Sequence, residues 1–288
     1  MNTVLQQMLK AYPESDFEKP ENVIKEVIQE VILCGLAQSD FFKRVAFNGG
    51  TCLRIFYGLP RFSEDLDFSI LGRDESFEIT DYFPVLQREV NALGLQVEFQ
   101  EEAKRQATTV KTAIAKGNTR TQMLTFYADE KLAGQFAANN LIKVKFEVDT
   151  DPLDYAVTEV KTRILPRFNE VRVFDLSTLF AGKLHAVISR KWNNRVKGRD
   201  LFDYVFYLQQ GAKVNMKYLR EKLLHSNTIS GQDNFNFDML KELLNDRFTA
   251  MDYVSAKDDV RRFIKDERDL SYWSASFFQT ITKEYLKE

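Results

Sequence analysis

The segment that most constrains the fold is a short strand, a glycine pair, a helix and a second strand in direct succession. Residues 44–48 have the apolar pattern of a strand, and Gly49 and Gly50 follow it at once. A helical pattern covers 51–59 and stops at a leucine–proline pair. From residue 65 to 70, apolar residues alternate with polar ones, which is the period of a strand with one buried face. This succession predicts a sheet with helices packed on it.

The remaining pattern predicts an α+β fold in two parts. Further β-like runs follow the first two strands, at 95–100, 108–115, 121–128, 141–149 and 158–164. Before them, an amphipathic helix is expected over 20–39. After them, helical patterns dominate, at 175–193, 199–210, 216–225, 236–247, 256–268 and 273–287. We predict an α+β domain over residues 1–165 and a helical C-terminal domain over 166–288.

Composition excludes several classes of protein. No run of residues is long and apolar enough for a membrane span, and the first 20 residues do not resemble a signal peptide, so we expect a cytoplasmic protein without membrane partners. Cys34 and Cys52 lie in apolar surroundings and are expected to be reduced core thiols. Because the chain has only two histidines, His185 and His225, we do not expect a zinc site. With 40 basic and 42 acidic residues, any nucleic-acid contact must use a local patch.

The glycine pair between strand and helix has the chemistry of a phosphate-binding turn. Without a Cβ, Gly49 and Gly50 let the backbone approach a phosphate closely, and the next N–H groups point toward it. Thr51 adds a hydroxyl to this turn. The alternative is an ordinary tight turn, which two glycines alone would fit equally well.

Asp65 and Asp67 are the strongest candidates for a metal site. Two residues apart on one strand, they place both carboxylates on the same face, where they repel each other unless a cation lies between them. Mg²⁺ prefers such oxygen ligands and bridges them to substrate phosphates, and Mn²⁺ could take its place. A solvated strand face is the alternative, although aspartate is a poor strand former.

A third carboxylate is expected on the strand at residues 141–149. Apolar residues there alternate with Lys143, Lys145, Glu147 and Asp149. Glu147 lies in the middle of the strand, where its position would be rigid, and we select it to complete a two-metal site. Asp149 lies near the strand end and fits a turn residue. An ordinary half-exposed strand remains the alternative.

A second group of charges lies in the helical part. Lys183 and Arg190 fall on one stripe of a predicted helix, and Asp200 and Asp203 share a face of the next helix. Lys183 is a candidate triphosphate anchor, acting as a point charge. The basic stretch 190–199 is a local patch that would attract a polyanion. The alternative is a basic helix end that forms ion pairs with an acidic helix start.

Taken together, these segments resemble the AbiEii family, the nucleotidyltransferase toxins of type IV toxin–antitoxin systems. The residues that carry the resemblance are Gly49–Arg54, Arg61–Phe68, the strand with Glu147, Ala181–Ala186 and Arg199–Asp203. The resemblance implies a DNA polymerase β-like nucleotidyltransferase fold with a mixed sheet, a nucleoside triphosphate donor and a metal held by Asp65 and Asp67. It matches Lys183 to the family's motif lysine, and Asp200 with Asp203 to its last acidic motif. It also implies a cognate antitoxin, and in certain members an acceptor at the end of tRNA.

We therefore predict a Mg²⁺-dependent nucleotidyltransferase that moves a nucleoside monophosphate from a nucleoside triphosphate to RNA or tRNA, as a toxin of a type IV toxin–antitoxin or phage-defence system. The predicted catalytic residues are Asp65, Asp67, Glu147, Lys183 and Asp200, of which the first three hold metal. The predicted nucleotide-binding residues are Gly49, Gly50, Thr51, Arg54, Ser63, Lys183, Arg190 and Asp203. Two alternatives stay open: transfer to a small molecule or protein, and a non-catalytic module that binds nucleotide or RNA.

Overall fold

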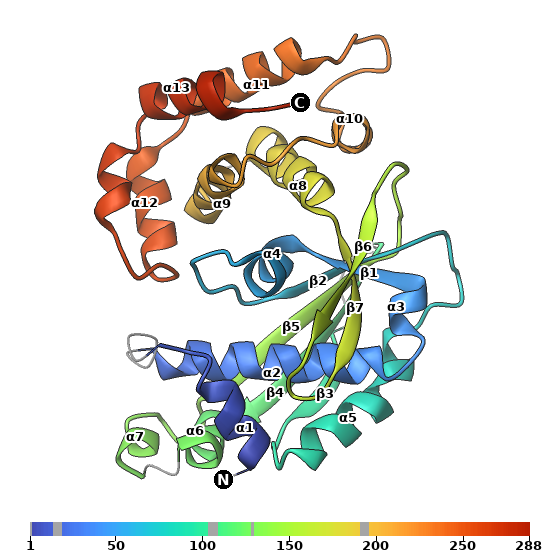
Figure 1. Cartoon of the computed structure of the whole chain (residues 1–288), viewed down its shortest axis with the longest axis vertical. Helices are drawn as coiled ribbons and strands as arrows, with labels where there is room; N and C mark the ends of the chain where they lie inside the picture. Colours follow the sequence, from blue (N-terminus) through green and yellow to red (C-terminus); the bar gives the residue numbers. More distant parts are fainter. Residues whose placement is uncertain (1, 14–18, 103–108, 128–129, 191–195) are drawn as a thin grey trace. The chain divides into compact units, whose positions relative to one another are not determined.

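The chain forms two compact units in a computed structural model that describes residues 2–13, 19–102, 109–127, 130–190 and 196–288 (Figure 1). The first unit, here the sheet unit, comprises Met1–Cys52, Ser63–Pro152 and Glu159–Val173. The second, here the helical unit, comprises Leu53–Phe62, Leu153–Thr158 and Phe174–Glu288. The units interleave along the chain, since two short segments that precede residue 174 belong to the same unit as the C-terminal helices. The boundary after residue 165 stays a prediction about domains.

The sheet unit is built on a mixed sheet that has seven strands in the described part of the chain. In chain order the strands are β1 (Val45–Asn48), β2 (Leu66–Ile70), β3 (Glu98–Glu101), β4 (Val110–Asn118), β5 (Leu141–Asp149), β6 (Thr158–Arg163) and β7 (Asn169–Phe174). Their order in the sheet is β3-β4-β5-β2-β1-β7-β6. The central strand β2 is antiparallel to β1 and parallel to β5. Two strands that are distant in sequence thus become direct neighbours.

Alternation explains why the central strands have one apolar and one polar face. In β2, Leu66, Phe68 and Ile70 are buried, whereas Asp67 and Ser69 are partly exposed. The ring of Phe68 lies 5.1 Å from those of Phe41 and Phe47, centroid to centroid, so aromatic packing anchors the apolar face. The opposite face is left for the charged residues.

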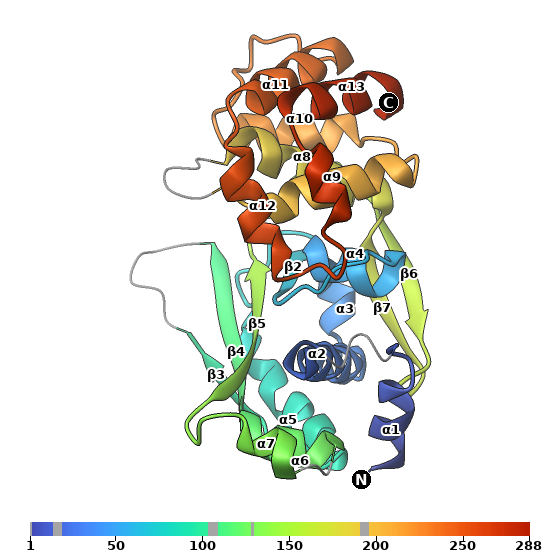
Figure 2. The same cartoon turned by 90° about the vertical axis from the view of Figure 1, so that its left-hand side faces the viewer.

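Helices cover the apolar face of the sheet. The long helix α2 (Pro20–Ala37) begins with proline in its first turn and buries apolar residues at helical spacing along most of its length. It contacts β5 and packs beside α5 (Phe83–Ala92), as both views show (Figures 1 and 2). The other helices of this unit are α1 (Thr3–Leu9), α3 (Phe41–Arg44), η2 (Ile79–Tyr82), α6 (Thr119–Tyr127) and α7 (Glu130–Gly134). Helix α4 (Gly49–Tyr57) begins in this unit and ends in the helical unit.

The helical unit consists of helices around an aromatic core. Its helices are α8 (Leu176–Ser189), α9 (Gly198–Gln209), α10 (Met216–His225), α11 (Phe237–Thr249), α12 (Tyr253–Arg261), η3 (Arg268–Tyr272) and α13 (Ala275–Tyr285). Phe180 of α8 stacks on Tyr207 of α9, with ring centroids 4.6 Å apart. The hydroxyl of Tyr204 lies 2.7 Å from that of Thr282, which satisfies both buried groups.

The predicted α+β class with a mixed sheet, packed helices and a helical C-terminal part is confirmed. Two details were wrong. Residues 121–128 were expected to form a strand, but Thr119–Tyr127 is a helix, whose first turn is capped by the side chain of Asn118. Strand β7 was not predicted at all. Cys34 and Cys52 are buried free thiols, as expected.

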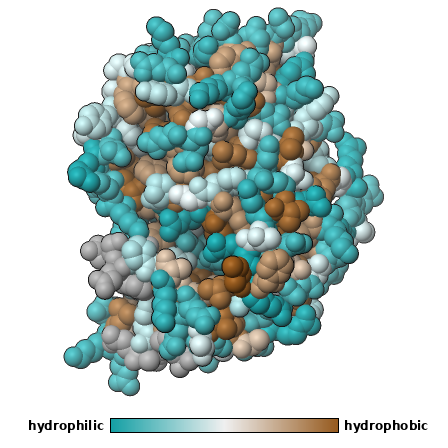
Figure 3. All heavy atoms as spheres, viewed as in Figure 1, coloured by the Kyte–Doolittle hydropathy of each residue, from teal (hydrophilic) through white to brown (hydrophobic). Residues whose placement is uncertain are grey.

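The surface carries mixed polarity. On the face drawn in Figure 3, hydrophilic residues predominate and hydrophobic residues lie between them. Among the described residues, none of the helices has the length and apolarity that crossing a membrane requires.

Candidate active site

The glycine turn brings the start of α4 against Asp67. Gly49 follows β1 directly and has φ +75°, a left-handed conformation that glycine adopts without strain. A Cβ atom at this position would lie 2.3 Å from Oδ2 of Asp67 and 2.9 Å from its Cβ. Residue 49 therefore has to be glycine for two reasons: the positive φ angle of its backbone, and the space that the Asp67 carboxylate occupies.

Register places four polar side chains in one row across the sheet. Asn48 of β1 pairs with Asp67 of β2, Asp67 pairs with Glu147 of β5, and Glu147 pairs with Thr112 of β4. Residues that pair in register point to the same side of a sheet, so Asp67 and Glu147 are side by side. The sequence predicted that both are on polar faces, but only the strand pairing makes those faces one surface.

Asp65 lies just before the first residue of β2, because the strand begins at Leu66. Two residues before Asp67, it belongs to the next row of the sheet, together with Lys145, which is two residues before Glu147 on β5. We refer to Asp65, Asp67, Lys145 and Glu147 as the carboxylate face. It contains all three predicted metal ligands and one lysine that the sequence analysis did not select.

Lys145 neutralises part of this negative charge. Its Nζ lies 2.8 Å from Oε1 of Glu147, and the hydroxyl of Thr112 donates to the same oxygen at 3.1 Å. Burial by itself lowers the pKa of Lys145, but the hydrogen bond and charge of Glu147 and the charge of Asp65 outweigh it and raise that pKa. The signal in the sequence was the alternation that placed Lys145 and Glu147 on one side of the same strand.

The loop that carries Asp65 is held by hydrogen bonds from two helices. Gln29 of α2 donates to the carbonyl oxygens of Ser63 at 3.0 Å and Glu64 at 2.9 Å. Thr51 of α4 is fully buried, and its hydroxyl donates to the carbonyl oxygen of Asp65. The Thr51 hydroxyl, expected to face phosphate, instead holds the loop that carries Asp65. The phosphate contacts of Gly50, Thr51 and Ser63 stay predictions.

The second group of predicted residues forms a buried ion-pair network in the helical unit. Arg61 makes a bidentate contact with Asp203, at 2.6 and 2.7 Å, and both side chains are almost completely buried. Lys183 of α8 lies 2.8 Å from both Asp200 and Asp203 of α9. Arg190, at the end of α8, also contacts Asp200. A basic helix end thus pairs with an acidic helix start, which the sequence analysis had kept as the alternative.

Charge in this network is mutually stabilised. Burial alone lowers the pKa of Lys183, but the charges of Asp200 and Asp203 outweigh it and raise that pKa. Burial likewise works to raise the pKa of Asp203, but Arg61 and Lys183 outweigh it and lower that pKa. Lys183 and Asp203 are therefore both charged at neutral pH. The predicted role of Lys183 as a triphosphate anchor stays a prediction.

Arg54 stabilises its own segment of the helical unit. Its guanidinium donates to the carbonyl oxygen of Leu59 at 2.9 Å and lies over the ring of Phe62, 4.9 Å from the centroid. Its predicted contact with nucleotide stays a prediction.

The basic stretch 190–199 is described only at its ends, because residues 191–195 lie outside the described part of the chain. At those ends, burial and the positive charges of Arg190 and Arg199 lower the pKa of Lys197. The described cations of this stretch also have acidic neighbours, since Arg190 contacts Asp200 and Arg199 lies 3.7 Å from Asp259. The predicted contact of this stretch with a polyanion stays a prediction.

No set of three carboxylates converges in the part of the chain that the structure describes. No group of three or more His, Cys, Asp or Glu side chains there is close enough to hold a metal ion. Glu147 contacts Lys145 and Thr112. The metal assignment of Asp65, Asp67 and Glu147 therefore stays a prediction.

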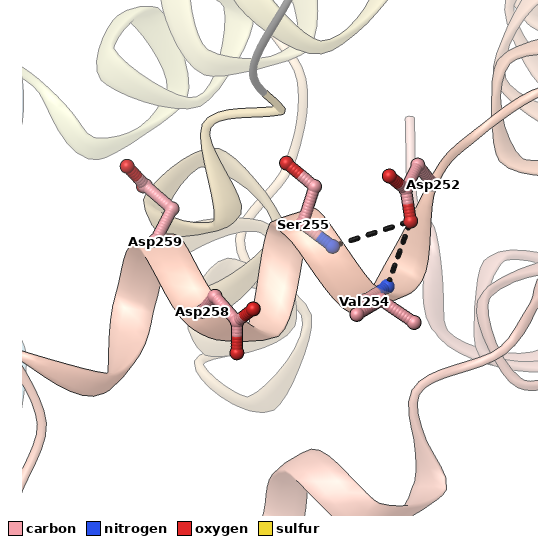
Figure 4. A pocket seen from close by; sticks show the side chains of 5 residues that line it. All are labelled: Asp252, Val254, Ser255, Asp258 and Asp259. Carbon is pink, nitrogen blue, oxygen red and sulfur yellow. Dashed lines mark hydrogen bonds between the residues drawn. The ribbon is translucent and has the colours of Figure 1, made fainter.

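An open hollow of about 410 Å³ lies along α12 and contains none of the predicted residues (Figure 4). Asp252 at its edge accepts hydrogen bonds from the backbone N–H groups of Val254 and Ser255 and so caps the helix. Asp258 pairs with Arg261 on the same helix. These acidic groups have structural partners, and the hollow is not the candidate active site.

Comparison with known proteins gives one family. A family model described as nucleotidyl transferase AbiEii toxin, type IV TA system, matches residues 31–280, a range that includes both groups of candidate residues. Among curated proteins, none matches the chain. The structure of JHP933 from Helicobacter pylori is similar in fold, with a TM-score of 0.50, 18% identity, and coverage of 92% of this chain and 93% of that chain.

Two further solved structures cover nearly the whole chain at lower similarity. A putative nucleotidyltransferase from H. pylori has a TM-score of 0.46 and 18% identity, and covers 95% of this chain and 97% of its own. MenT4, a nucleotidyltransferase toxin from Mycobacterium tuberculosis H37Rv, has a TM-score of 0.47 and 15% identity, and covers 96% of this chain and 98% of its own.

Proposed function

Because the chain belongs to the AbiEii family, the nucleotidyltransferase toxins of type IV toxin–antitoxin systems, we propose that it transfers a nucleoside monophosphate to RNA, with tRNA as the acceptor. Family membership makes the chain a nucleotidyltransferase and implies a nucleoside triphosphate substrate and a cognate antitoxin. The RNA acceptor, the use of Mg²⁺ and a cytoplasmic location are the parts that we propose.

The observation that carries the proposal is the contact between the glycine turn and the carboxylate face. Gly49 leaves room for the Asp67 carboxylate, and Asp67 lies in register with Glu147 on the neighbouring strand. The start of α4, with its backbone N–H groups, thereby lies beside the Asp67 carboxylate of β2. A nucleoside triphosphate bound with a divalent cation needs both kinds of group, N–H donors for phosphate and oxygen ligands for the cation.

The pair Asp65 and Asp67 offers the donors that a divalent cation such as Mg²⁺ takes. Both are carboxylates, whose oxygens hard cations prefer, and the Asp67 carboxylate occupies its place only because residue 49 lacks a Cβ. Asp65 and Asp67 would hold the cation, and Glu147 is the proposed third ligand. When bound, the cation would supply positive charge to the triphosphate and to the acceptor oxygen.

The chain's own residues would orient the donor phosphates. We propose that the N–H groups of Gly50 and Thr51 bind the phosphate tail, while the Thr51 hydroxyl keeps Asp65 in place through its carbonyl oxygen. Lys183 is the proposed cation for charge that accumulates on the leaving pyrophosphate, with Asp200 and Asp203 as the groups that position its ammonium. Arg190 and the following basic residues would attract the RNA backbone.

The double variant Asp65→Asn plus Asp67→Asn tests this proposal. It should abolish transfer while leaving the fold intact, since Asp67 and Asp65 are partly or fully exposed and asparagine keeps their shape. Purified protein is incubated with each labelled nucleoside triphosphate and total RNA. Asp149→Asn, which removes a carboxylate from the same strand as Glu147, is the matched control and should retain activity within about threefold. Equal labelling by the wild type and the double variant would refute the proposal.

The same assay separates the alternative acceptors. Transfer that continues after nuclease treatment of the acceptor pool would identify a small molecule or a protein as the acceptor, in place of RNA. Nucleotide binding without turnover on any acceptor would instead support the non-catalytic alternative.

A further inference from the structure

Lys145 is the charged residue of the carboxylate face that the proposed reaction does not use. It contacts Glu147 at 2.8 Å and acts electrostatically on Asp65 from the same row of the sheet. Its side chain is 35% exposed and that of Glu147 is 25% exposed, so water screens the pair only in part. The ammonium therefore lies among the same carboxylates that the proposed cation would need.

The positive charge of Lys145 balances part of the negative charge on the carboxylate face. Carboxylates on one face of a sheet disfavour each other's charged form unless a positive charge lies near them. Lys145 supplies one positive charge and contacts Glu147 directly. A divalent cation would supply two charges to the same face, but to bind Glu147 it must compete with the lysine.

We propose that Lys145 is the resident counter-ion of the carboxylate face, and that the divalent cation binds in competition with Lys145 for Glu147. This inference rests on the proposed function, because it takes Asp65, Asp67 and Glu147 as the cation ligands. Lys145 thereby acts as a positioning residue, which holds the Glu147 carboxylate until the cation displaces it.

The neighbouring lysine of the same strand lacks these features. Lys143 is exposed and lies in register with Lys116 of β4, so the residue opposite it is another cation. It is two residues further from Glu147 than Lys145 is. Lys143 therefore gives a matched control with the same charge, the same strand and the same face.

Direct Mn²⁺ titration tests the competition without any turnover. Free Mn²⁺ is followed by electron paramagnetic resonance for the wild type, Lys145→Met, Lys145→Arg and Lys143→Met. Lys145→Met should bind Mn²⁺ about two- to fivefold more tightly, the range that corresponds to losing a partly screened ion pair. Lys145→Arg, which keeps the charge, and Lys143→Met should stay within about twofold of the wild type.

A double variant isolates the residue for which the lysine competes. Adding Glu147→Gln to Lys145→Met should remove most of the gain, because Glu147 is then no longer a ligand to be released. Thermal unfolding without metal checks that each variant is folded. Equal or weaker Mn²⁺ binding by Lys145→Met, or the same gain in Lys143→Met, would overturn the inference.

The outcome for the proposed function is read separately. If the wild type binds Mn²⁺ and Asp65→Asn plus Asp67→Asn does not, the proposed cation site holds whatever Lys145 does. If neither the wild type nor Lys145→Met binds Mn²⁺, both the site and the competition are refuted.

Discussion

Replacing Gly49 with alanine adds one methyl group beside the Asp67 carboxylate. The new Cβ would lie 2.3 Å from Oδ2, whereas ordinary van der Waals contact begins at 3.4 Å, so the carboxylate must move by about 1 Å. A displacement of about 1 Å in a reacting group costs on the order of 100-fold in rate. Separately, alanine in a left-handed conformation costs about 1–2 kcal/mol of stability.

Gly94 provides the control that separates these two effects. It follows α5 in the same unit, has φ +76°, and a Cβ there would meet nothing within 4 Å. Gly94→Ala therefore carries the backbone cost of about 1–2 kcal/mol without a clash. Both variants should show a similar loss in the free energy of unfolding, measured by chemical denaturation, with a further loss for Gly49→Ala only if Asp67 cannot move freely.

Activity should then distinguish the variants. In the labelling assay with nucleoside triphosphate and RNA, Gly49→Ala should lose about 100-fold in rate at a temperature where it remains folded, and Gly94→Ala should stay within about threefold of wild type. Full activity of Gly49→Ala would show that the position of Asp67 does not control the reaction. An equal loss in Gly94→Ala would show that backbone strain, and not the clash, is responsible.

Other perturbations test the surroundings of the site. Thr51→Val should lower activity about tenfold and stability by about 1–3 kcal/mol, because it removes the buried hydroxyl that holds the Asp65 carbonyl. Thr51→Ser keeps the hydroxyl and should retain both activity and stability. Full activity of Thr51→Val would contradict this role of the hydroxyl. Arg61→Met should lower the free energy of unfolding by about 3 kcal/mol, since it leaves Asp203 buried beside Lys183 alone; a change below 1 kcal/mol in denaturation would refute it. The pKa of Asp203 is lowered in the folded state, so its charged form stabilises the fold above about pH 4. This contribution to the free energy of unfolding should disappear as the pH falls from 3.8 through the folded pKa. Unfolding curves of wild type and Asp203→Asn, measured over this pH range, should therefore differ in their sensitivity to acid. EDTA should abolish labelling and Mg²⁺ or Mn²⁺ should restore it; activity that persists in EDTA would exclude the proposed cation.

The sequence predicted those parts of the fold whose signal is local. Strand β5 matches its predicted span, residues 141–149, because alternation with period two depends only on neighbouring residues. The predicted strand over 121–128 was wrong because threonine and aromatic residues favour a strand by propensity, whereas the Asn118 cap and packing on β4 and α2 make Thr119–Tyr127 helical. Strand β7 was not predicted, although Val171 and Val173 are buried in alternation with Glu170 and Arg172, the same period of two that identified β5.

For the candidate site, the sequence predicted which residue types take part, and only the structure showed which of them lie side by side. Asp65 and Asp67 are close because they are two residues apart on one chain segment. Nothing local to Glu147 indicates that β5 pairs with β2, since register is set by which hydrophobic faces are buried together. The same pairing introduced Lys145, whose contact with Glu147 was not foreseen.

The helical unit shows the same division. Helical spacing alone placed Lys183 and Arg190 on one stripe, and Asp200 and Asp203 on another. Only tertiary packing joined these stripes and brought Arg61 from the N-terminal half of the chain onto Asp203. A buried charge is tolerated only beside its counter-charge, and the sequence carries no record of which distant residue will provide it.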